Sequence, residues 1–197
     1  MLLINISSDK VALDDGNRQE RLDRNGIEDV LGPTLLDWHK SSPFQDVFLI
    51  NGPGGFTNLR VGTLMLNMLN AVAEPKIQIF SVDKLTLFAH LVEQKVLPAI
   101  GAIYLGQKHN IWLTDFTTNP PTTKEIKISE LPADVFLDEV CDQYRPNGTE
   151  NMIHFSNQKD KLFVTYQDKK HEIIIQDLNI KPTVHVEADY MIEPVLN

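Results

Sequence analysis

The sequence predicts an α/β protein built on a mixed β-sheet, and three observations lead to that class. The chain opens with the apolar run "MLLINISS", followed by "KVALDDGNRQERL", in which Asp15-Gly16 is a hairpin turn signal between two short extended pieces. After these three antiparallel strands, helical and strand patterns alternate as far as Val96. The second half is dominated by strand-like alternation. This order implies a mixed sheet with helices on its faces.

The elements of the first half follow in order. "NGIEDVLGPTLLDWHKSS" has helical spacing, although Gly32-Pro33 is expected to bend or interrupt that helix. "DVFLI" is a continuous apolar strand of the kind buried on both faces, and "NGPGGFTNLRVG" leads into a helix from about Phe56 to Ala73. "IQIFSV" is predicted to be a strand and "DKLTLFAHLVEQKV" an amphipathic helix.

The second half is predicted to be mostly strands. "PAIGAIYLGQKHNIWLTDF" favours two adjacent strands and "TKEIKISEL" a third. "ADVFLDEVCDQY" favours a short helix after Pro132, and the stretch from Glu150 to Leu178 alternates as strands do. We therefore expect two lobes, residues 1–97 and a smaller, divergent lobe of residues 98–197.

Composition limits the function. The 197 residues are 42% hydrophobic, which predicts a folded core. A net charge of −9 argues against direct nucleic-acid binding, because neutralising phosphates needs a basic face. The single cysteine, Cys141, excludes an intramolecular disulfide and fits a reducing compartment. No apolar run approaches the roughly 20 residues of a membrane span, and no signal-peptide pattern is present. We expect a cytoplasmic protein.

The glycine-rich loop raises two alternatives, a phosphate cradle and a tight structural turn. Backbone amides at a helix N-terminus attract anions. However, "GGFTNLR" lacks the lysine of a Walker loop, and the spacing of Gly52, Gly54 and Gly55 does not fit a dinucleotide fingerprint. The residues favour the turn.

The helix behind this loop is apolar around most of its circumference. Its polar residues Thr63, Asn67 and Asn70 form one narrow stripe. Such a helix is buried on more than one side, so its second side faces either the preceding helix or another chain. Arg60 lies near the helix N-terminus, which is electrostatically unfavourable for a cation and favours an acidic partner.

Other candidate chemistry is weak. Histidines 39, 90, 109, 154, 171 and 185 include no pair at i, i+4 spacing and no HExxH pattern, which argues against a metal site or a peptidase. Asp14-Asp15 precede Gly16 and are explained by turn preference. We expect no catalytic residue, no metal and no cofactor.

The string "GPGGFTNLRVGTLMLNML" resembles the signature of the TsaB (YeaZ) family of bacterial tRNA threonylcarbamoyladenosine biosynthesis proteins. "MLLINISS", "EDVLGPTLL", "IFSVDKLTLFA", "GAIYLGQKHNIWLTDF" and "VEADYMIEPV" resemble further family segments in the same order, whereas the match is weak from about Lys124 to Lys181. The positions matching the signature are Gly52, Pro53, Gly54, Phe56, Thr57, Leu59, Arg60 and Gly62.

The resemblance implies an actin-like (ASKHA, ribonuclease H-like) fold, two lobes of mixed β-sheet with flanking helices, the second lobe being reduced. It also implies a non-catalytic partner of a TsaD-like enzyme, with a TsaE-like ATPase as a further candidate partner and a homodimer when the chain is alone. The first two helices would form the interface. The expected interface residues are Leu31, Leu35, Arg60, Thr63, Met65, Leu66, Asn67, Leu69 and Asn70. The expected structural loop is Gly52, Pro53, Gly54, Gly55, Phe56 and Thr57.

Departures from the family pattern point away from catalysis. Asn5 replaces an acid that helps to hold metal and phosphates in active members of this superfold, and a neutral amide lacks the charge that Mg²⁺ prefers. Glu28 has no neighbouring histidine, Gly101 and Leu105 stand in the altered second-lobe hairpin, and Ile192 replaces a terminal arginine. The alternatives are a small actin-like ATPase or kinase and a drifted homodimer with a role unrelated to tRNA.

Overall fold

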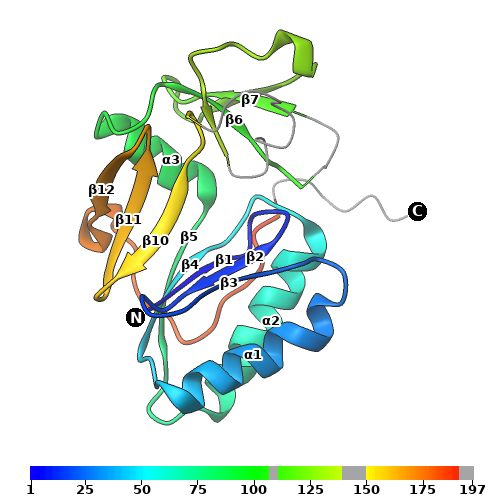
Figure 1. Ribbon diagram of the computed structural model, residues 1–197, viewed down its shortest axis with the longest axis vertical. Coiled ribbons are helices and arrows are strands. Elements are labelled where there is room, and N and C mark those ends of the chain that lie inside the picture. Colours follow the sequence, from blue (N-terminus) through cyan, green and yellow to red (C-terminus); the bar gives the residue numbers. More distant parts are fainter. Residues whose placement is uncertain (107–110, 139–149, 191–197) are drawn as a thin grey trace.

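The computed structural model describes residues 1–106, 111–138 and 150–190 (Figure 1). The strands of residues 2–82 form a five-stranded sheet with the order β3-β2-β1-β4-β5. We call this sheet, with the two helices packed side by side on it, the first lobe, and the two smaller sheets of the later strands the second lobe. Only β2 runs against the other strands, since β1 pairs antiparallel with β2 and parallel with β4. The predicted three-strand opening is confirmed. The strands are β1 (Leu2–Asn5), β2 (Val11–Asp14), β3 (Gln19–Leu22), β4 (Asp46–Ile50) and β5 (Gln78–Val82).

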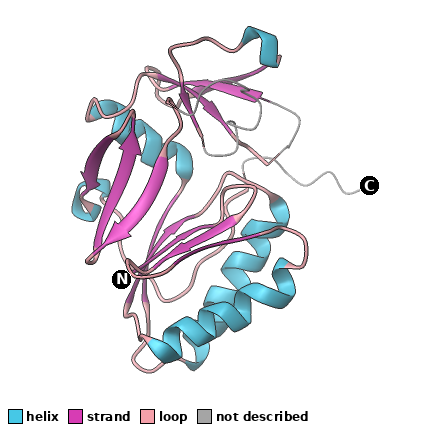
Figure 2. Cartoon of the chain, in the orientation of Figure 1, coloured by secondary structure: helices cyan, strands magenta, loops and turns pink. Residues whose placement is uncertain are grey.

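Helices cover both faces of this sheet. Helices α1 (Ile27–Ser41) and α2 (Phe56–Val72) pack side by side on one face, as Figures 1 and 2 show, and α3 (Lys84–Glu93) lies on the other. Alternating side chains of β1 serve the two cores: Ile4 packs toward α1 and α2, and Leu3 toward α3 and the second lobe. The inner strands are therefore buried on both faces, as their continuous apolar runs predict.

The predicted interruption of α1 does not occur. The helix continues through Pro33, and Gly32 lies where α1 meets α2. A Cβ at Gly32 would be only 2.9 Å from the Met65 sulfur, so this glycine allows the two helices to pack closely.

Two further sheets make up the second half. One has the order β8-β7-β6-β9, and the other has the order β10-β11-β12 and stands beside α3 (Figure 1). Their strands are β6 (Ile100–Ile103), β7 (Ile111–Asp115), β8 (Thr122–Ile126), β9 (Phe136–Leu137), β10 (His154–Gln158), β11 (Lys161–Tyr166) and β12 (Lys169–Ile173), with 3-10 turns η1 (Ile128–Glu130) and η3 (Ile175–Leu178).

The helix predicted after Pro132 is wrong where it can be compared. Phe136 and Leu137 form strand β9, which pairs parallel with Gly101 and Ala102 of β6. The Phe136 ring occupies the space that a side chain at Gly101 would fill. Long-range pairing therefore overrides the local pattern, and the remainder of the predicted helix, from residue 139, lies outside the described residues.

The chain returns to the first lobe near its C-terminus (Figure 1, red end of the colour bar). Thr183 pairs antiparallel with Ile79 of the edge strand β5, and Val186, only 5% exposed, joins the core under α1 and α2. The described residues form a mixed α/β fold, as the order of strand and helix patterns predicts. None of its described helices has the length and apolarity that a membrane crossing requires.

Candidate functional site

The glycine loop is packed by main-chain atoms of the same protein. A Cβ at Gly52, whose φ is +70°, would overlap the Asp189 carbonyl, and a Cβ at Gly54 would overlap the Ser7 carbonyl. A Cβ at Gly106 would overlap the Gly54 carbonyl in the same way. Three distant segments thus converge on the loop, and its glycines are needed because backbone lies where side chains would be. This contact pattern supports the structural role that the residues favour over a phosphate cradle.

The turn after β1 uses its polar groups internally. Asn5 Oδ1 accepts hydrogen bonds from the Ser7 amide at 2.9 Å and the Ser7 hydroxyl at 2.8 Å, and Asn5 Nδ2 donates to Ser8 Oγ. Asn58, from the first turn of α2, donates to the carbonyls of Ser8 and Asp9. The Asn5 side chain therefore serves to hold this turn.

A buried lysine joins the two lobes. Lys84, fully buried at the start of α3, donates from Nζ to the Ser7 carbonyl at 3.0 Å and the Tyr104 carbonyl at 2.7 Å. Its third partner is Asp138 Oδ2 at 2.7 Å. Ser7 lies just after β1 in the first lobe, and Tyr104 lies directly after β6 in the second lobe. We call Lys84, Asp138 and these two carbonyls the interlobe centre.

The chemistry of the interlobe centre is self-contained. An ammonium has three N–H donors, and all three of those of Lys84 bind groups of this chain. Asp138 neutralises its charge and also accepts from the Tyr104 amide. The centre therefore offers a phosphate neither a spare ammonium donor nor a net positive charge. Among the described residues no cluster of three His, Cys, Asp or Glu side chains could hold a metal ion.

The polar stripe of α2 binds the C-terminal segment. Asn67 exchanges two hydrogen bonds with the main chain of Val186, and Asn70 donates to the carbonyls of Val184 and Ile77. Thr63 bonds instead to the Leu59 carbonyl of its own helix. The sequence analysis assigned these residues to a partner interface and missed the role of the asparagines. That role depends on residues 183–189, which return to α2 from the far end of the chain.

Most of the predicted interface residues are covered within the chain. Arg60 is exposed, and Met65 and Asn67 are partly buried, against α1 and the C-terminal segment respectively. The interface on the first two helices stays a prediction, but most of the residues predicted for it are not accessible to a partner. The covered residues are Leu31, Leu35, Thr63, Leu66, Leu69 and Asn70.

The exposed side of α2 carries apolar residues that sequence reasoning did not select. Leu64, Met68 and Val72 are 50%, 56% and 73% exposed, and their i, i+4, i+8 spacing places them on one side of the helix together with Arg60. We call these four residues the outer face of α2. Their helical spacing was the one feature of the sequence that could have identified them. It did not stand out, because the neighbouring positions of the helix are apolar too.

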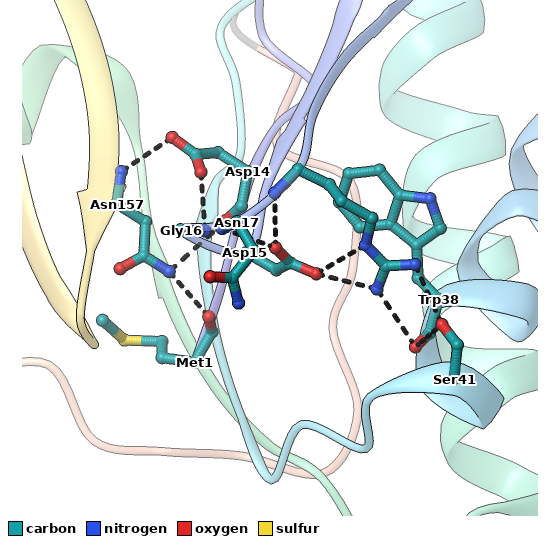
Figure 3. Close-up of polar contacts among 9 residues, drawn as sticks. Met1, Asp14, Asp15, Gly16, Asn17, Trp38, Ser41 and Asn157 are labelled. Carbon is teal, nitrogen blue, oxygen red and sulfur yellow. Dashed lines mark hydrogen bonds and ion pairs between the residues drawn. The ribbon is translucent and has the colours of Figure 1, made fainter.

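The acidic pair Asp14-Asp15 at the β2–β3 turn makes hydrogen bonds where the first lobe meets β10 (Figure 3). The buried Asp14 accepts from the Gly16 amide through Oδ1 and from the Asn157 amide of β10 through Oδ2, both at 2.8 Å. Asn157 Nδ2 donates to the Met1 carbonyl at 2.7 Å. The carboxylate thus ties the turn to β10 and has a structural role.

Hydrogen bonds lower the pKa of Asp15, the neighbouring acid in this turn. Burial alone would raise the pKa of the Asp15 carboxyl, but hydrogen bonds from the Asn17 amide and from Arg18 outweigh it and lower the pKa. The Arg18 guanidinium also stacks on Trp38, 4.5 Å from the ring centroid. The pair Asp15–Arg18 therefore fixes the turn against α1.

The C-terminal segment places Asp189 against Gly52 of the glycine loop. Burial raises the pKa of Asp189, and the charge of Asp83, the N-cap of α3, raises it further. Nearby, Tyr190 stacks on Phe56 at the start of α2, with ring centroids 5.2 Å apart. The aromatic contact holds the segment in place, whereas the two carboxyl groups repel each other.

Comparisons with known proteins give matches among solved structures alone. No family model matches the sequence, and no curated protein gives a significant match. YeaZ from Pseudomonas aeruginosa is similar, with 15% identity, a TM-score of 0.43, and coverage of 77% of this chain and 82% of that one. An uncharacterized protein from the same organism, with similarity to peptidase YEAZ, matches with the same identity and coverage and a TM-score of 0.41. Both similarities concern the fold alone.

Proposed function

We propose that this chain is a non-catalytic, TsaB-like subunit that pairs through α1 and α2 with a TsaD-like threonylcarbamoyltransferase in tRNA modification. The string "GPGGFTNLRVG" supports the assignment to this system. The observation that carries the pairing is the outer face of α2, which exposes three large apolar side chains in one row.

This outer face has the composition of a docking surface. Exposed apolar side chains in a contiguous row are typical of interaction sites. Leu36 of α1, 39% exposed, adds a further apolar side chain on the neighbouring helix. Arg60 forms no hydrogen bond or ion pair with any residue that the structure describes, so its guanidinium is available to a carboxylate of the partner.

The interlobe region supports a role without catalysis. The amide of Asn5 holds its own turn, and the ammonium of Lys84 is neutralised by Asp138. An actin-like ATPase or kinase needs charge and free donors for nucleotide phosphates at this place. The alternative enzyme function is therefore disfavoured, and calorimetry with ATP and Mg²⁺ tests it directly, because saturable binding would restore it.

The docking proposal is tested by co-purification with a TsaD-like enzyme and by rescue of threonylcarbamoyladenosine formation in a strain lacking its own TsaB. Leu64→Arg should abolish both, because it places a charge in the centre of the apolar row. Ile174→Arg is the matched control, since Ile174 is 49% exposed but lies beyond β12 in the second half of the chain. If the wild-type chain neither binds nor rescues, the proposal fails.

We propose that the same face also forms a homodimer when the chain is alone. Light scattering of the purified protein should give twice the monomer mass, and Leu64→Arg should halve it while Ile174→Arg leaves it unchanged. A wild-type mass of 22.4 kDa would remove the homodimer from the proposal. It would leave the heteromeric pairing to be decided by co-purification.

A further inference from the structure

A cleft of about 790 Å³ lies between α3 and two turns of the second half of the chain. Its walls come from the exposed side of α3, from the turn between β7 and β8, and from the 3-10 turn η3. The volume is within the range of roughly 300–1,000 Å³ that small-molecule sites have. Neither the interlobe centre nor the outer face of α2 contributes a lining residue, so the cleft is separate from both. We call it the α3 cleft.

The floor of the α3 cleft is apolar. Leu85, Phe116 and Leu178 line it and are 9%, 8% and 8% exposed, because each also packs in the core between α3 and the second lobe. Ala89, one helical turn after Leu85, adds a small apolar side chain to the same floor. An aliphatic chain can cover such a floor in the way that the methylene stem of a lysine covers apolar surface.

The rim of the α3 cleft is acidic. Asp83 and Glu93 lie at the two ends of α3, and Asp177 lies in the wall formed by η3. The side chains of Glu93 and Asp177 form no ion pair with any residue that the structure describes. Asp83 caps α3 by accepting from the Thr86 amide through Oδ1.

No basic side chain balances these acids within the cleft. Among the described residues that line it, none is a lysine or an arginine, and only His90 can gain a positive charge near neutral pH. A cleft that carries charge of one sign above a low-dielectric floor raises the local concentration of ions of the opposite sign. The lining therefore selects a cation that also has an apolar part.

The spacing of the acids selects an elongated cation. Asp83 and Glu93 are ten positions apart in the sequence. With a rise of about 1.5 Å per residue, they are about 15 Å apart along the helix. A single metal ion is too small to contact both, and no group of three acids or histidines in the described part of the chain could hold one. A chain of methylene groups with an ammonium at each end matches acids at both ends of an apolar floor.

We propose that the α3 cleft is a binding site for a linear aliphatic polyamine. Its terminal ammonium groups pair with Asp83 and Glu93, an inner ammonium pairs with Asp177, and its methylene groups cover the apolar floor. The site goes beyond the proposed role in tRNA modification and does not depend on it.

Isothermal titration calorimetry of the full chain tests the proposal, with spermidine as the probe. The matched control ligand is hexaamminecobalt(III), which carries the same charge as spermidine in a compact form without methylene groups. We expect saturable binding of spermidine at one site. Hexaamminecobalt(III) should bind about tenfold or more weakly, because burial of about two methylene groups alone accounts for such a factor.

Two double variants separate the cleft from the general negative charge of the protein. Glu93→Gln with Asp177→Asn should weaken spermidine binding about fivefold to tenfold, because two ion pairs with the ligand are lost. Glu20→Gln with Asp37→Asn removes the same net charge from exposed positions of β3 and α1. This control pair should leave the affinity within about twofold, because salt screens charges that are distant from the cleft.

A third variant blocks the cleft without changing any charge. Thr86 is exposed on α3 and lines the cleft, and its capping hydrogen bond uses its main-chain amide, which Thr86→Trp retains. The indole should occupy the space above the floor and abolish spermidine binding. Absence of saturable binding to the wild-type chain, equal binding of hexaamminecobalt(III), equal losses in the two double variants, or unchanged binding to Thr86→Trp would each overturn the proposal. No TsaD-like enzyme is present, so these results are independent of the docking test.

Discussion

The interlobe centre and the outer face of α2 differ in whether their side chains find partners within the chain. In the centre, a buried ammonium, a buried carboxylate and two carbonyls satisfy one another within the chain. On the outer face, large apolar side chains and an arginine are left to solvent. The chain's own groups therefore fill the interlobe centre, whereas the outer face of α2 stays open. The contrast favours the outer face of α2 over the interlobe centre as the place where the proposed partner would bind.

The largest effect should come from opening the interlobe centre. Lys84→Met leaves the Asp138 carboxylate buried without its counter-charge, which typically costs about 3–5 kcal/mol of unfolding free energy. Urea denaturation measures the loss. Combining Lys84→Met with Asp138→Asn removes the unpaired charge and should recover a large part of the stability. A single variant as stable as wild type would show that the ion pair does not hold the lobes.

A smaller loss is expected at the glycine loop. Gly54→Ala would drive its methyl group into the Ser7 carbonyl, and overpacking of this kind costs about 1–3 kcal/mol. Gly55→Ala is the matched control, because its Cβ would lie 3.4 Å from the Tyr104 hydroxyl, which is close to ordinary contact. The difference between the two unfolding free energies measures the close approach. Equal stabilities would contradict a packing role for Gly54.

Asp189→Asn should change the pH dependence of stability in a defined direction. The folded-state pKa of Asp189 is raised above its ordinary value of 3.8, so the folded protein binds the proton more tightly than the unfolded chain does. Its contribution to stability is therefore fully present below pH 3.8 and is lost as the pH rises through the folded pKa. Asp189→Asn should stabilise the protein at neutral pH and flatten this part of the profile. Thermal unfolding from pH 3 to 7 measures it, and a variant less stable than wild type at pH 7 would contradict the sign.

The smallest effect is expected on the outer face. Met68→Gln alters a side chain that is 56% exposed and should change the unfolding free energy by less than about 0.5 kcal/mol. Leu66→Ala, two residues away but 1% exposed, should cost about 2–5 kcal/mol. If Met68→Gln destabilises the isolated chain as much as Leu66→Ala does, the outer face is packed and is not a docking surface.

Local patterns were sufficient for much of the fold. The three-strand opening, the alternation that follows and the strands of residues 154–173 were predicted, because each depends on periodicity and turn residues within a short window. Strand β9 was missed, because Phe136 is extended only through its pairing with a glycine 35 positions away in sequence.

The candidate site was harder to predict than the fold. The glycine loop and α2 were identified as important, but the direction in which each side of α2 faces was not. Leu64 and Leu66 are the same residue type two positions apart, and only tertiary packing decides which of them is exposed. Lys84 carried no signal, because a lysine at the start of a helix is ordinarily a solvated residue.

The hydrogen bonds of Asn67 and Asn70 to the main chain of the C-terminal segment, residues 183–190, have a consequence for how this protein changes over evolutionary time. Because these asparagines bind main-chain carbonyls and amides, substitutions at Val184, His185 and Glu187 should be nearly neutral. Asn67 and Val186 should tolerate few changes. The C-terminal segment of related chains would then diverge rapidly around one fixed apolar position. A tail under so little constraint loses its alignable sequence while its path across the sheet edge persists.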